Sequence, residues 1–303
     1  MRWRLAIALI ATIALGAVLW VQPPSQDRIS GHQSARFAGG YVWDRTDNWF
    51  GGFSGLEMSA DGQEFSALTD RGYIVTGRFN RVGGDVSDVA IDSARSLLND
   101  VGTPVTGNLT DAEGIAIDQD GKMYVSFEYV QRIWVYDTPD AKAQWASYTK
   151  AWRALKNNGG LEMLAVNESG TLFTMPEFRD KGATEAQVFR WSRGGKWQQP
   201  FTLPLRGRFL PVGGDFGPDG KLYLLERAVT PFGFRSRVRR FDVVEDGVSN
   251  EEVLFTSWPG KHDNLEGIAV WQDQQDRIRF TLISDDNFMW FQRTELAEYV
   301  MED

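Results

Sequence analysis

The segments Glu113-Gly114-Ile115-Ala116-Ile117 and Glu266-Gly267-Ile268-Ala269-Val270 are two copies of a short pattern that occurs five times along the chain. Each copy is an apolar strand that opens with or near a glycine, followed by a tight turn and a second strand that ends near an acid. The other copies are Ser54-Gly55-Leu56-Glu57-Met58, Glu162-Met163-Leu164-Ala165-Val166 and Val212-Gly213-Gly214-Asp215-Phe216. Repeated hairpins of this kind are typical of radial β arrays, in which each unit buries its apolar face against its neighbours. The sequence therefore predicts an all-β protein with the β-propeller fold.

The spacing of the copies predicts the number of blades. Successive copies begin roughly 50 to 60 residues apart, which is the length of one four-stranded blade. The residues after 266 and those between about 35 and 54 together supply one more blade, so joining the two ends closes a ring of five. A sixth, degenerate blade in the long first interval is the alternative. The propeller domain is expected to span residues 35–303, and residues 141–155 have a composition that favours a helix between strands of the second blade.

The first blade offers four segments in which apolar and polar residues alternate as they do in half-buried strands. These segments cover residues 55–60, 64–69, 73–80 and 86–93.

Residues 1–25 resemble an export signal. Arg2 and Arg4 precede an uncharged and mostly apolar run over residues 5–21. This run is long for the core of a signal peptide and short for a membrane-spanning helix, so the sequence predicts either a cleaved signal peptide or an uncleaved anchor in the inner membrane. We expect a periplasmic or exported protein. Because the chain has no cysteine, it must be stable without disulfides.

The composition limits the partners and cofactors. A net charge of −9 and a pI near 4.9 argue against nucleic acid or an anionic membrane surface, since both require a basic face. With no cysteine and only two histidines, the usual zinc and copper sites are disfavoured, whereas oxygen ligands suited to Ca²⁺ are abundant. We therefore expect a monomer that uses Ca²⁺ and acts on a small anionic ester or phosphoester.

Three glutamates occupy the same position in the repeat. Glu113, Glu162 and Glu266 each open a strand that is expected to line the central channel, so they should converge at one mouth of it. The fourth copy has Val212 at this position and carries an acid, Asp215, three residues later. We predict that these four acids hold the cation, with the three glutamates also serving as catalytic groups. The alternative is that the acids only cap strand ends.

A second set of acids follows the second strand of each repeat, one strand further out and, by expectation, on the opposite rim or near it. The set comprises Asp70, Glu128, Glu177, Glu226, Asp285 and Asp286. Arginines accompany these acids, and a guanidinium group binds phosphate or carboxylate through two hydrogen bonds. The predicted substrate-binding residues are Arg71, Arg132, Arg179 and Arg227. Ion pairs between blades are the alternative role for these arginines.

Several motifs resemble those of the bacterial family named for an esterase-like activity of phytase. They include Gly51-Gly52-Phe53-Ser54-Gly55-Leu56, Leu68-Thr69-Asp70-Arg71-Gly72, Asp111-Ala112-Glu113-Gly114-Ile115-Ala116, Val125-Ser126-Phe127-Glu128, Asn264-Leu265-Glu266-Gly267-Ile268-Ala269 and Ile283-Ser284-Asp285-Asp286-Asn287-Phe288. The resemblance spans residues 35–300 and implies an exported propeller that hydrolyses an ester or phosphoester. The Glu-Gly openings are also similar to those of gluconolactonase-like propellers, in which a channel glutamate helps to hold a divalent metal.

Together, these features predict a phytase-like hydrolase of a phosphate or carboxylate ester, with a divalent cation at the mouth of the channel. The alternative is a propeller of the cell envelope that binds a ligand or a protein without catalysis.

Overall fold

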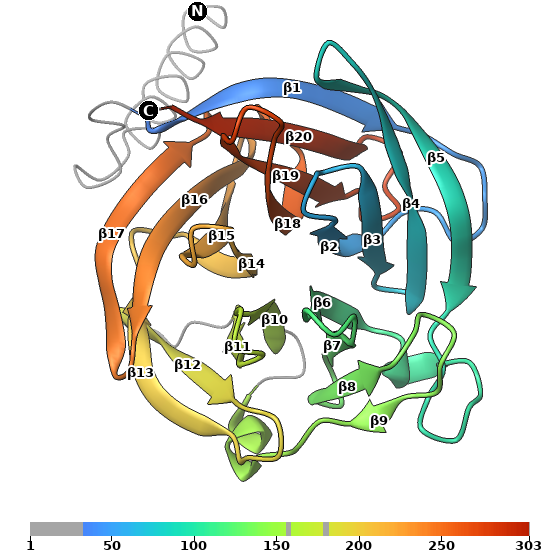
Figure 1. Cartoon of the computed structure of the whole chain (residues 1–303), viewed down its shortest axis with the longest axis vertical. Coiled ribbons are helices and arrows are strands. Elements are labelled where there is room, and N and C mark those ends of the chain that lie inside the picture. The colour runs from blue at the N-terminus through green and yellow to red at the C-terminus, as the bar shows by residue number, and fades with distance from the viewer. Residues whose placement is uncertain (1–32, 156–158, 178–181, 303) are drawn as a thin grey trace, which may run out of the picture. The chain divides into compact units, whose positions relative to one another are not determined.

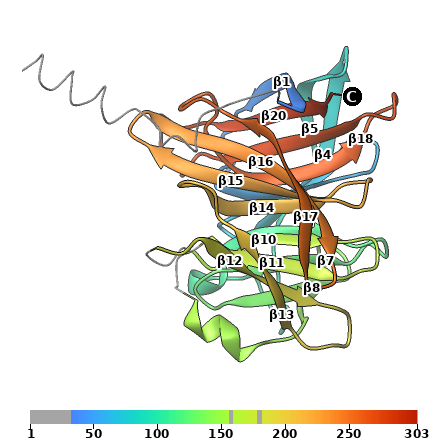
Figure 2. The same ribbon diagram turned by 90° about the vertical axis from the view of Figure 1, so that its left-hand side faces the viewer.

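The computed structural model describes residues 33–155, 159–177 and 182–302. Five four-stranded antiparallel sheets surround a central axis, which confirms the predicted five-bladed β-propeller (Figure 1). The described residues contain no sixth blade. Seen from the side, strands such as β14 and β15 run across the ring from one face to the other (Figure 2).

Within blades 1 to 4, the strands follow the chain order. Blade 1 consists of β2 (Phe53–Met58), β3 (Glu64–Thr69), β4 (Tyr73–Val82) and β5 (Asp85–Ser96). Blade 2 consists of β6 (Ala112–Ile117), β7 (Met123–Phe127), β8 (Arg132–Tyr136) and β9 (Gln144–Trp145). Blade 3 consists of β10 (Leu161–Val166), β11 (Leu172–Pro176), β12 (Glu185–Trp191) and β13 (Gln198–Pro204). Blade 4 consists of β14 (Leu210–Phe216), β15 (Leu222–Thr230), β16 (Gly233–Val244) and β17 (Gly247–Thr256). The four strands of blade 1 match the four predicted segments.

Blade 5 joins the two ends of the chain, as the spacing of the repeats predicts. Its strands are β18 (Asn264–Gln272), β19 (Ile278–Asp285), β20 (Thr294–Met301) and, on the outside, β1 (Ala35–Trp43). β1 pairs with β20 from Ala35 opposite Met301 to Trp43 opposite Thr294. The ring is thus closed by main-chain hydrogen bonds between segments at opposite ends of the described chain, without a disulfide.

The prediction of a helix over residues 141–155 is wrong. This segment forms the two-residue strand β9 and a short 3₁₀ helix, η2 (Lys150–Ala154); one other 3₁₀ turn, η1 (Gly107–Leu109), lies between blades 1 and 2. Trp152 of η2 is fully buried, and its ring lies 4.9 Å from that of Trp197. A single tight turn is enough to bury this indole, so the helix-forming residues around it do not extend into an α-helix.

The inner strands all break their pairing with the second strand at the same place. The register shifts between Phe53/Gly55, Ala112/Ile115, Leu161/Met163, Pro211/Gly213 and Leu265/Gly267. The first residue of every repeat lies inside such a β-bulge, which places an extra residue on one strand and changes the direction of its side chain. Glu113, Glu162 and Glu266 are therefore residues of equivalent bulges at the start of their strands.

The glycine that follows the bulge allows neighbouring inner strands to approach closely. A Cβ atom on Gly213 would lie 2.3 Å from the carbonyl oxygen of Glu266, and one on Gly114 would lie 2.7 Å from that of Glu162. Side chains at these positions would push adjacent blades apart at the axis. This contact explains why most copies of the repeat contain a glycine here.

The predicted export segment, residues 1–25, lies outside the described residues. Within the part of the chain that the structure describes, no helix is long and apolar enough to cross a membrane.

Candidate active site at the acidic mouth

The acids of both sets lie at the same end of the channel, except that the side chain of Glu226 is buried in blade 4, where it accepts hydrogen bonds from Arg237 and Arg239. The inner and second strands of each blade form an antiparallel hairpin, so the end of the second strand is level with the start of the first. In blade 2, Ala112 pairs with Phe127, and the backbone N–H of Glu128 donates to the carbonyl of Asp111 at 2.9 Å. The expectation that the second set lies on or near the opposite rim is therefore wrong.

We call this end of the channel the acidic mouth. It contains the carboxyl groups of Asp70, Asp111, Glu113, Glu128, Glu162, Glu177, Glu266, Asp285 and Asp286.

Three of these acids form a compact group in blade 2. Asp111 precedes β6, Glu113 lies in its bulge and Glu128 follows β7; one carboxylate oxygen from each lies within 4.8 Å of those of the other two. Two oxygens bound to one Ca²⁺ at about 2.3 to 2.6 Å are at most about 5 Å apart. The three side chains are therefore spaced for a single cation of this kind.

Glu128 is held firmly within this group. Its side chain is buried, and its Oε1 accepts hydrogen bonds from the backbone N–H of Gly160 at 2.6 Å and from that of Gly159. Backbone donors fix the position of a carboxylate without neutralising its charge fully. The same carboxyl group supplies one oxygen to the group formed with Asp111 and Glu113.

Glu162 of blade 3 connects to the blade 2 group. Its carboxyl group hydrogen-bonds with the carboxyls of Glu113 and Glu128. Burial raises the pKa of Glu162 well above its usual range, and the charge of Glu113 raises it further. Burial likewise raises the pKa of Glu113, and the nearby Glu266 adds to this. Glu113 and Glu162 therefore take up a proton more readily than exposed carboxyls do, and protonation of one affects the other.

Glu266 is paired with a cation. Arg227, in β15 of blade 4, donates hydrogen bonds to Glu177 at 2.5 Å, to Asn264 at 2.5 Å and to Glu266. Although burial lowers the pKa of Arg227, the carboxylates of Glu266 and Glu177 outweigh this and raise it overall. The structure thus engages Glu266 in an ion pair between blades, although its carboxylate stays close enough to act on Glu113.

Other acids of the mouth also take up protons more readily than usual. Burial raises the pKa of Asp70 to about 7, with Asp111 as the next cause. Burial raises the pKa of Asp111 itself to about 6 and that of Asp285 to about 8. Asp70 Oδ1 is buried and has no hydrogen-bond partner. Such crowding of buried carboxyls is costly without a cation, and perturbed groups of this kind are frequent at functional sites.

Asp215 is not part of the mouth. It lies near the other end of its inner strand, and its Oδ2 accepts a hydrogen bond of 2.7 Å from the backbone N–H of Val270. Glu57 occupies the same repeat position in blade 1 and accepts at 3.2 Å from the N–H of Ile117. These acids link neighbouring blades, and the structure does not bring Asp215 to the three glutamates with which it was predicted to bind a cation.

The predicted arginines have different environments. Arg71 is exposed on the rim, where its guanidinium lies 3.3 Å from the centre of the Phe288 ring. Arg132 is buried and donates to the backbone carbonyls of Val130 and Leu109, so its guanidinium is not available to a ligand at the mouth. Arg227 lies within the mouth, as described above. Arg179 lies outside the described residues.

The channel below the mouth is almost closed. The bulge residues and the glycines beside them line a cavity of only about 10 Å³, which is room for about one water molecule. A substrate larger than a water molecule does not fit in this cavity. Its bulk must lie on the mouth face of the ring.

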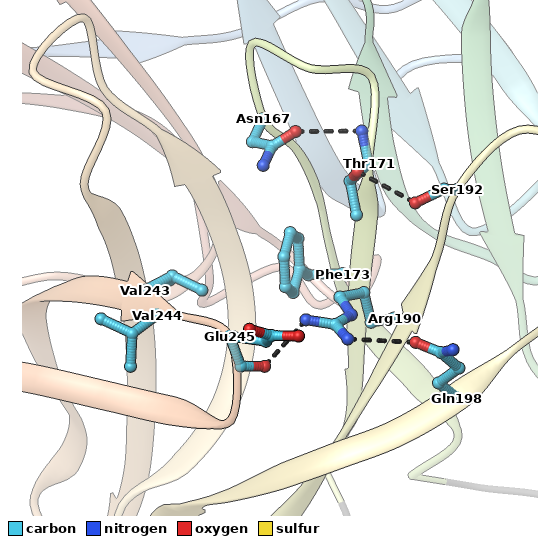
Figure 3. A pocket seen from close by; sticks show the side chains of 9 residues that line it. All are labelled: Asn167, Thr171, Phe173, Arg190, Ser192, Gln198, Val243, Val244 and Glu245. Atoms are coloured by element: carbon cyan, nitrogen blue, oxygen red, sulfur yellow. Dashed lines mark hydrogen bonds between the residues drawn. The ribbon is translucent and has the colours of Figure 1, made fainter.

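A larger cavity, of about 320 Å³, lies between blades 3 and 4 at the other face (Figure 3). Its polar groups largely bond to one another: Arg190 donates to Gln198 at 3.0 Å and to the carbonyl of Glu245 at 2.8 Å. Asn167 accepts from the backbone N–H of Thr171 at 2.9 Å. This cavity lacks converging carboxyls, so the smaller acidic mouth is the better candidate for chemistry.

Asp111 was not among the predicted ligands. A signal was present in Asp111-Ala112-Glu113, which places two acids at the start of the same inner strand. Placing Glu128 beside them also requires the hairpin register, in which the acid after the second strand is level with the acid that opens the first.

A protein-family model described as "Phytase-like: Esterase-like activity of phytase" matches residues 48–288. The chain belongs to this family. Its model covers the inner strands of all five blades and every carboxyl group of the acidic mouth.

Solved structures with some similarity to this phytase-like chain include a sugar dehydrogenase and two proteins described as gluconolactonases. The PQQ-bound aldose sugar dehydrogenase from Streptomyces coelicolor is 12% identical, with 89% of this chain and 99% of that chain covered and a TM-score of 0.47. A gluconolactonase from Xanthomonas campestris is 14% identical, with 81% and 71% covered and a TM-score of 0.41. A putative gluconolactonase is 13% identical, with 87% and 94% covered and a TM-score of 0.46. No curated protein matches the sequence.

Proposed function

We propose that this phytase-like propeller is an exported hydrolase of a phosphate or carboxylate ester and that it uses a divalent cation at the acidic mouth. The observation that carries this proposal is the group formed by Asp111, Glu113 and Glu128, whose ligand oxygens lie within 4.8 Å of one another. The family description, which names an esterase-like activity, supports the reaction class. Export rests on the apolar run over residues 5–21, which precedes the propeller.

The residues present fit Ca²⁺. Asp111, Glu113 and Glu128 supply only hard oxygen ligands, which suit Ca²⁺ or Mg²⁺ better than zinc or copper. Burial and neighbouring carboxylates raise the pKa values of Glu113 and Asp111, and a bound cation would counter both effects. When bound, the cation would contribute Lewis acidity towards the ester and acidify a water molecule.

The chain's own residues supply the remaining functions. Arg71 on the rim is placed to bind an anionic substituent of the substrate, and Arg227 supplies positive charge deeper in the mouth for the charge that develops on the reacting group. Burial raises the pKa of Glu162 beside Glu113, which makes it the candidate general acid for the departing alkoxide. Glu266 orients Arg227, which makes it a positioning residue in this scheme.

Turnover of simple esters tests the proposal. We expect the purified propeller with Ca²⁺ to hydrolyse 4-nitrophenyl acetate or 4-nitrophenyl phosphate, and Glu113→Gln to reduce kcat/KM by about a hundredfold or more. Glu57→Gln is the matched control, because Glu57 is also a buried acid of an inner strand but lies at the other end of the channel. Folded wild-type protein that hydrolyses neither ester with Ca²⁺, or Glu113→Gln with wild-type turnover, would contradict the proposal. The first of these results would favour a binding propeller without catalysis.

A further inference from the structure

One loop on the mouth face displays a run of large apolar side chains to solvent. The loop joins β19 to β20, and Phe288, Met289, Trp290 and Phe291 have 40%, 50%, 93% and 65% of their surface exposed. Single exposed apolar residues are ordinary, but four in succession form a patch of the kind found at binding surfaces. The loop starts at Asp286, directly after the mouth residue Asp285.

The backbone of this loop is fixed in a conformation that exposes these side chains. Asn287 and Phe288 have positive φ angles of 47° and 52°, which non-glycine residues rarely adopt. Asp286 holds them: its Oδ1 accepts from the backbone N–H of Phe288 at 3.1 Å and from that of Gly52 at 3.0 Å. At the far end of the loop, the side chain of Gln292 donates to Asp263 at 3.0 Å. Backbone strain that is maintained by surrounding contacts is frequent at functional sites.

Phe288 connects the loop to the acidic mouth. A Cβ atom built on Gly52 would lie 2.6 Å from Cζ of Phe288 and 2.2 Å from Oδ1 of Asp70, so the ring and the carboxylate meet over this glycine. Arg71 stacks on the same ring at 3.3 Å. An apolar surface therefore begins with Phe288 at the edge of the mouth. It continues along the loop to Phe291, and no polar residue interrupts this stretch of sequence.

Resting on the proposed function, we propose that this loop is the apolar subsite of the mouth, and that the substrate is an ester that carries an extended apolar chain. The nearly closed channel leaves the mouth face as the place for the bulk of the substrate. With its ester group at the carboxyls, the apolar chain of such a substrate lies over Phe288 and along Met289, Trp290 and Phe291. Among the exposed apolar residues at this end of the ring, only this loop offers four in succession and also contacts a carboxyl-bearing residue of the mouth, through Phe288, within the described residues.

Binding of alkylphosphonates tests this inference separately from turnover. Butylphosphonate and octylphosphonate are each titrated into three proteins in the presence of Ca²⁺ and below micellar concentrations. The proteins are wild type, the double variant Trp290→Ser/Phe291→Ser and the control Val82→Ser. Val82 is also an exposed apolar residue, but it lies in the hairpin between β4 and β5 at the other face. We expect wild type and Val82→Ser to bind octylphosphonate about tenfold more tightly than butylphosphonate, since four more methylenes are partly buried. In the double variant this preference should disappear while the affinity for butylphosphonate is unchanged.

The inference is overturned if the chain-length preference is absent in wild type, or if it persists in the double variant. Binding of wild type, but not of the double variant, to phosphatidylcholine vesicles without a chain-length preference would instead assign the loop to a membrane surface and also overturn it. Failure of the proposed function is recognised differently, by ester turnover that does not respond to Glu113→Gln. The two proposals therefore fail on separate measurements.

Discussion

Arg227 of blade 4 donates a hydrogen bond of 2.5 Å to Glu177 of blade 3, and the same guanidinium contacts Glu266 of blade 5. One cation thus joins three blades at the axis. Blade 4 has Val212 where blades 2, 3 and 5 have a glutamate, so it adds no acid at this position. It contributes the cation Arg227 from its second strand instead. Asp111, Glu113 and Glu128, which form the candidate cation site in blade 2, make no salt bridge with another described residue.

Arg227→Met should destabilise the propeller strongly at alkaline pH. The substitution leaves Glu177 and Glu266 in a largely buried place without their counter-charge, which costs about 3 kcal/mol of unfolding free energy. The loss should be smaller at pH 5, because the raised pKa of Glu266 allows it to take up a proton. Urea denaturation at pH 5 and pH 8 measures both values, with Arg227→Lys as the control that keeps the charge. Equal unfolding free energies for Arg227→Met and wild type at pH 8 would show that this ion pair contributes little.

Asp70→Asn should stabilise the metal-free protein at high pH. The pKa of Asp70 is raised from 3.8 to about 7, so between these values the folded protein keeps a proton that the unfolded chain has lost. Stability therefore falls as the pH rises through this window, and the asparagine variant does not suffer this loss. In the presence of a chelator, the Tm of Asp70→Asn should match that of wild type near pH 4 and exceed it by about 2 °C or more at pH 8.

The control for this measurement is Asp246→Asn, in the exposed turn between β16 and β17 at the other face. Its Tm difference from wild type should be the same at both pH values. A constant difference for Asp70→Asn as well would contradict the assignment of Asp70 to a crowded group of carboxyls.

Gly213→Ala should destabilise the ring although it adds a single methyl group. The new Cβ would lie 2.3 Å from the carbonyl oxygen of Glu266, so blades 4 and 5 must separate at the axis. We expect a loss of about 3 kcal/mol, at the upper end of the cost of overpacking. Gly247→Ala is the control, because nothing lies within 4 Å of a Cβ at that position. Similar denaturation midpoints for the two variants would disprove the close approach of the inner strands.

Much of the fold could be predicted from the sequence, because every blade has the same packing requirements and the repeat reflects them. Each inner strand needs apolar residues for both of its faces and a small residue where it meets its neighbour, as at Gly114 and Gly213. Closure of the ring by β1 could be predicted because the residues before the first repeat and after the last one together make up one blade. The predicted helix over residues 141–155 failed because burial of Trp152 required only one short turn.

The site was harder to predict than the fold. The three glutamates do reach one mouth, but whether they share a ligand depends on partners that a repeat pattern does not contain. Glu266 is engaged by Arg227 from another blade, and Arg132 turns into the sheet to satisfy backbone carbonyls. Asp111 and Glu128 join Glu113 only through the bulge and the hairpin register. Such relationships depend on three-dimensional contacts between segments that are distant in sequence.

Calcium binding to the chelator-stripped protein from about residue 30 onwards tests the central claim most directly. Isothermal titration calorimetry at pH 8 should show about one equivalent of Ca²⁺ bound by wild type and by Glu57→Gln, and a loss of that binding in Glu113→Gln. Undiminished binding in Glu113→Gln, or no heat of binding in wild type together with no rise in Tm on addition of Ca²⁺, would contradict a cation site at the acidic mouth.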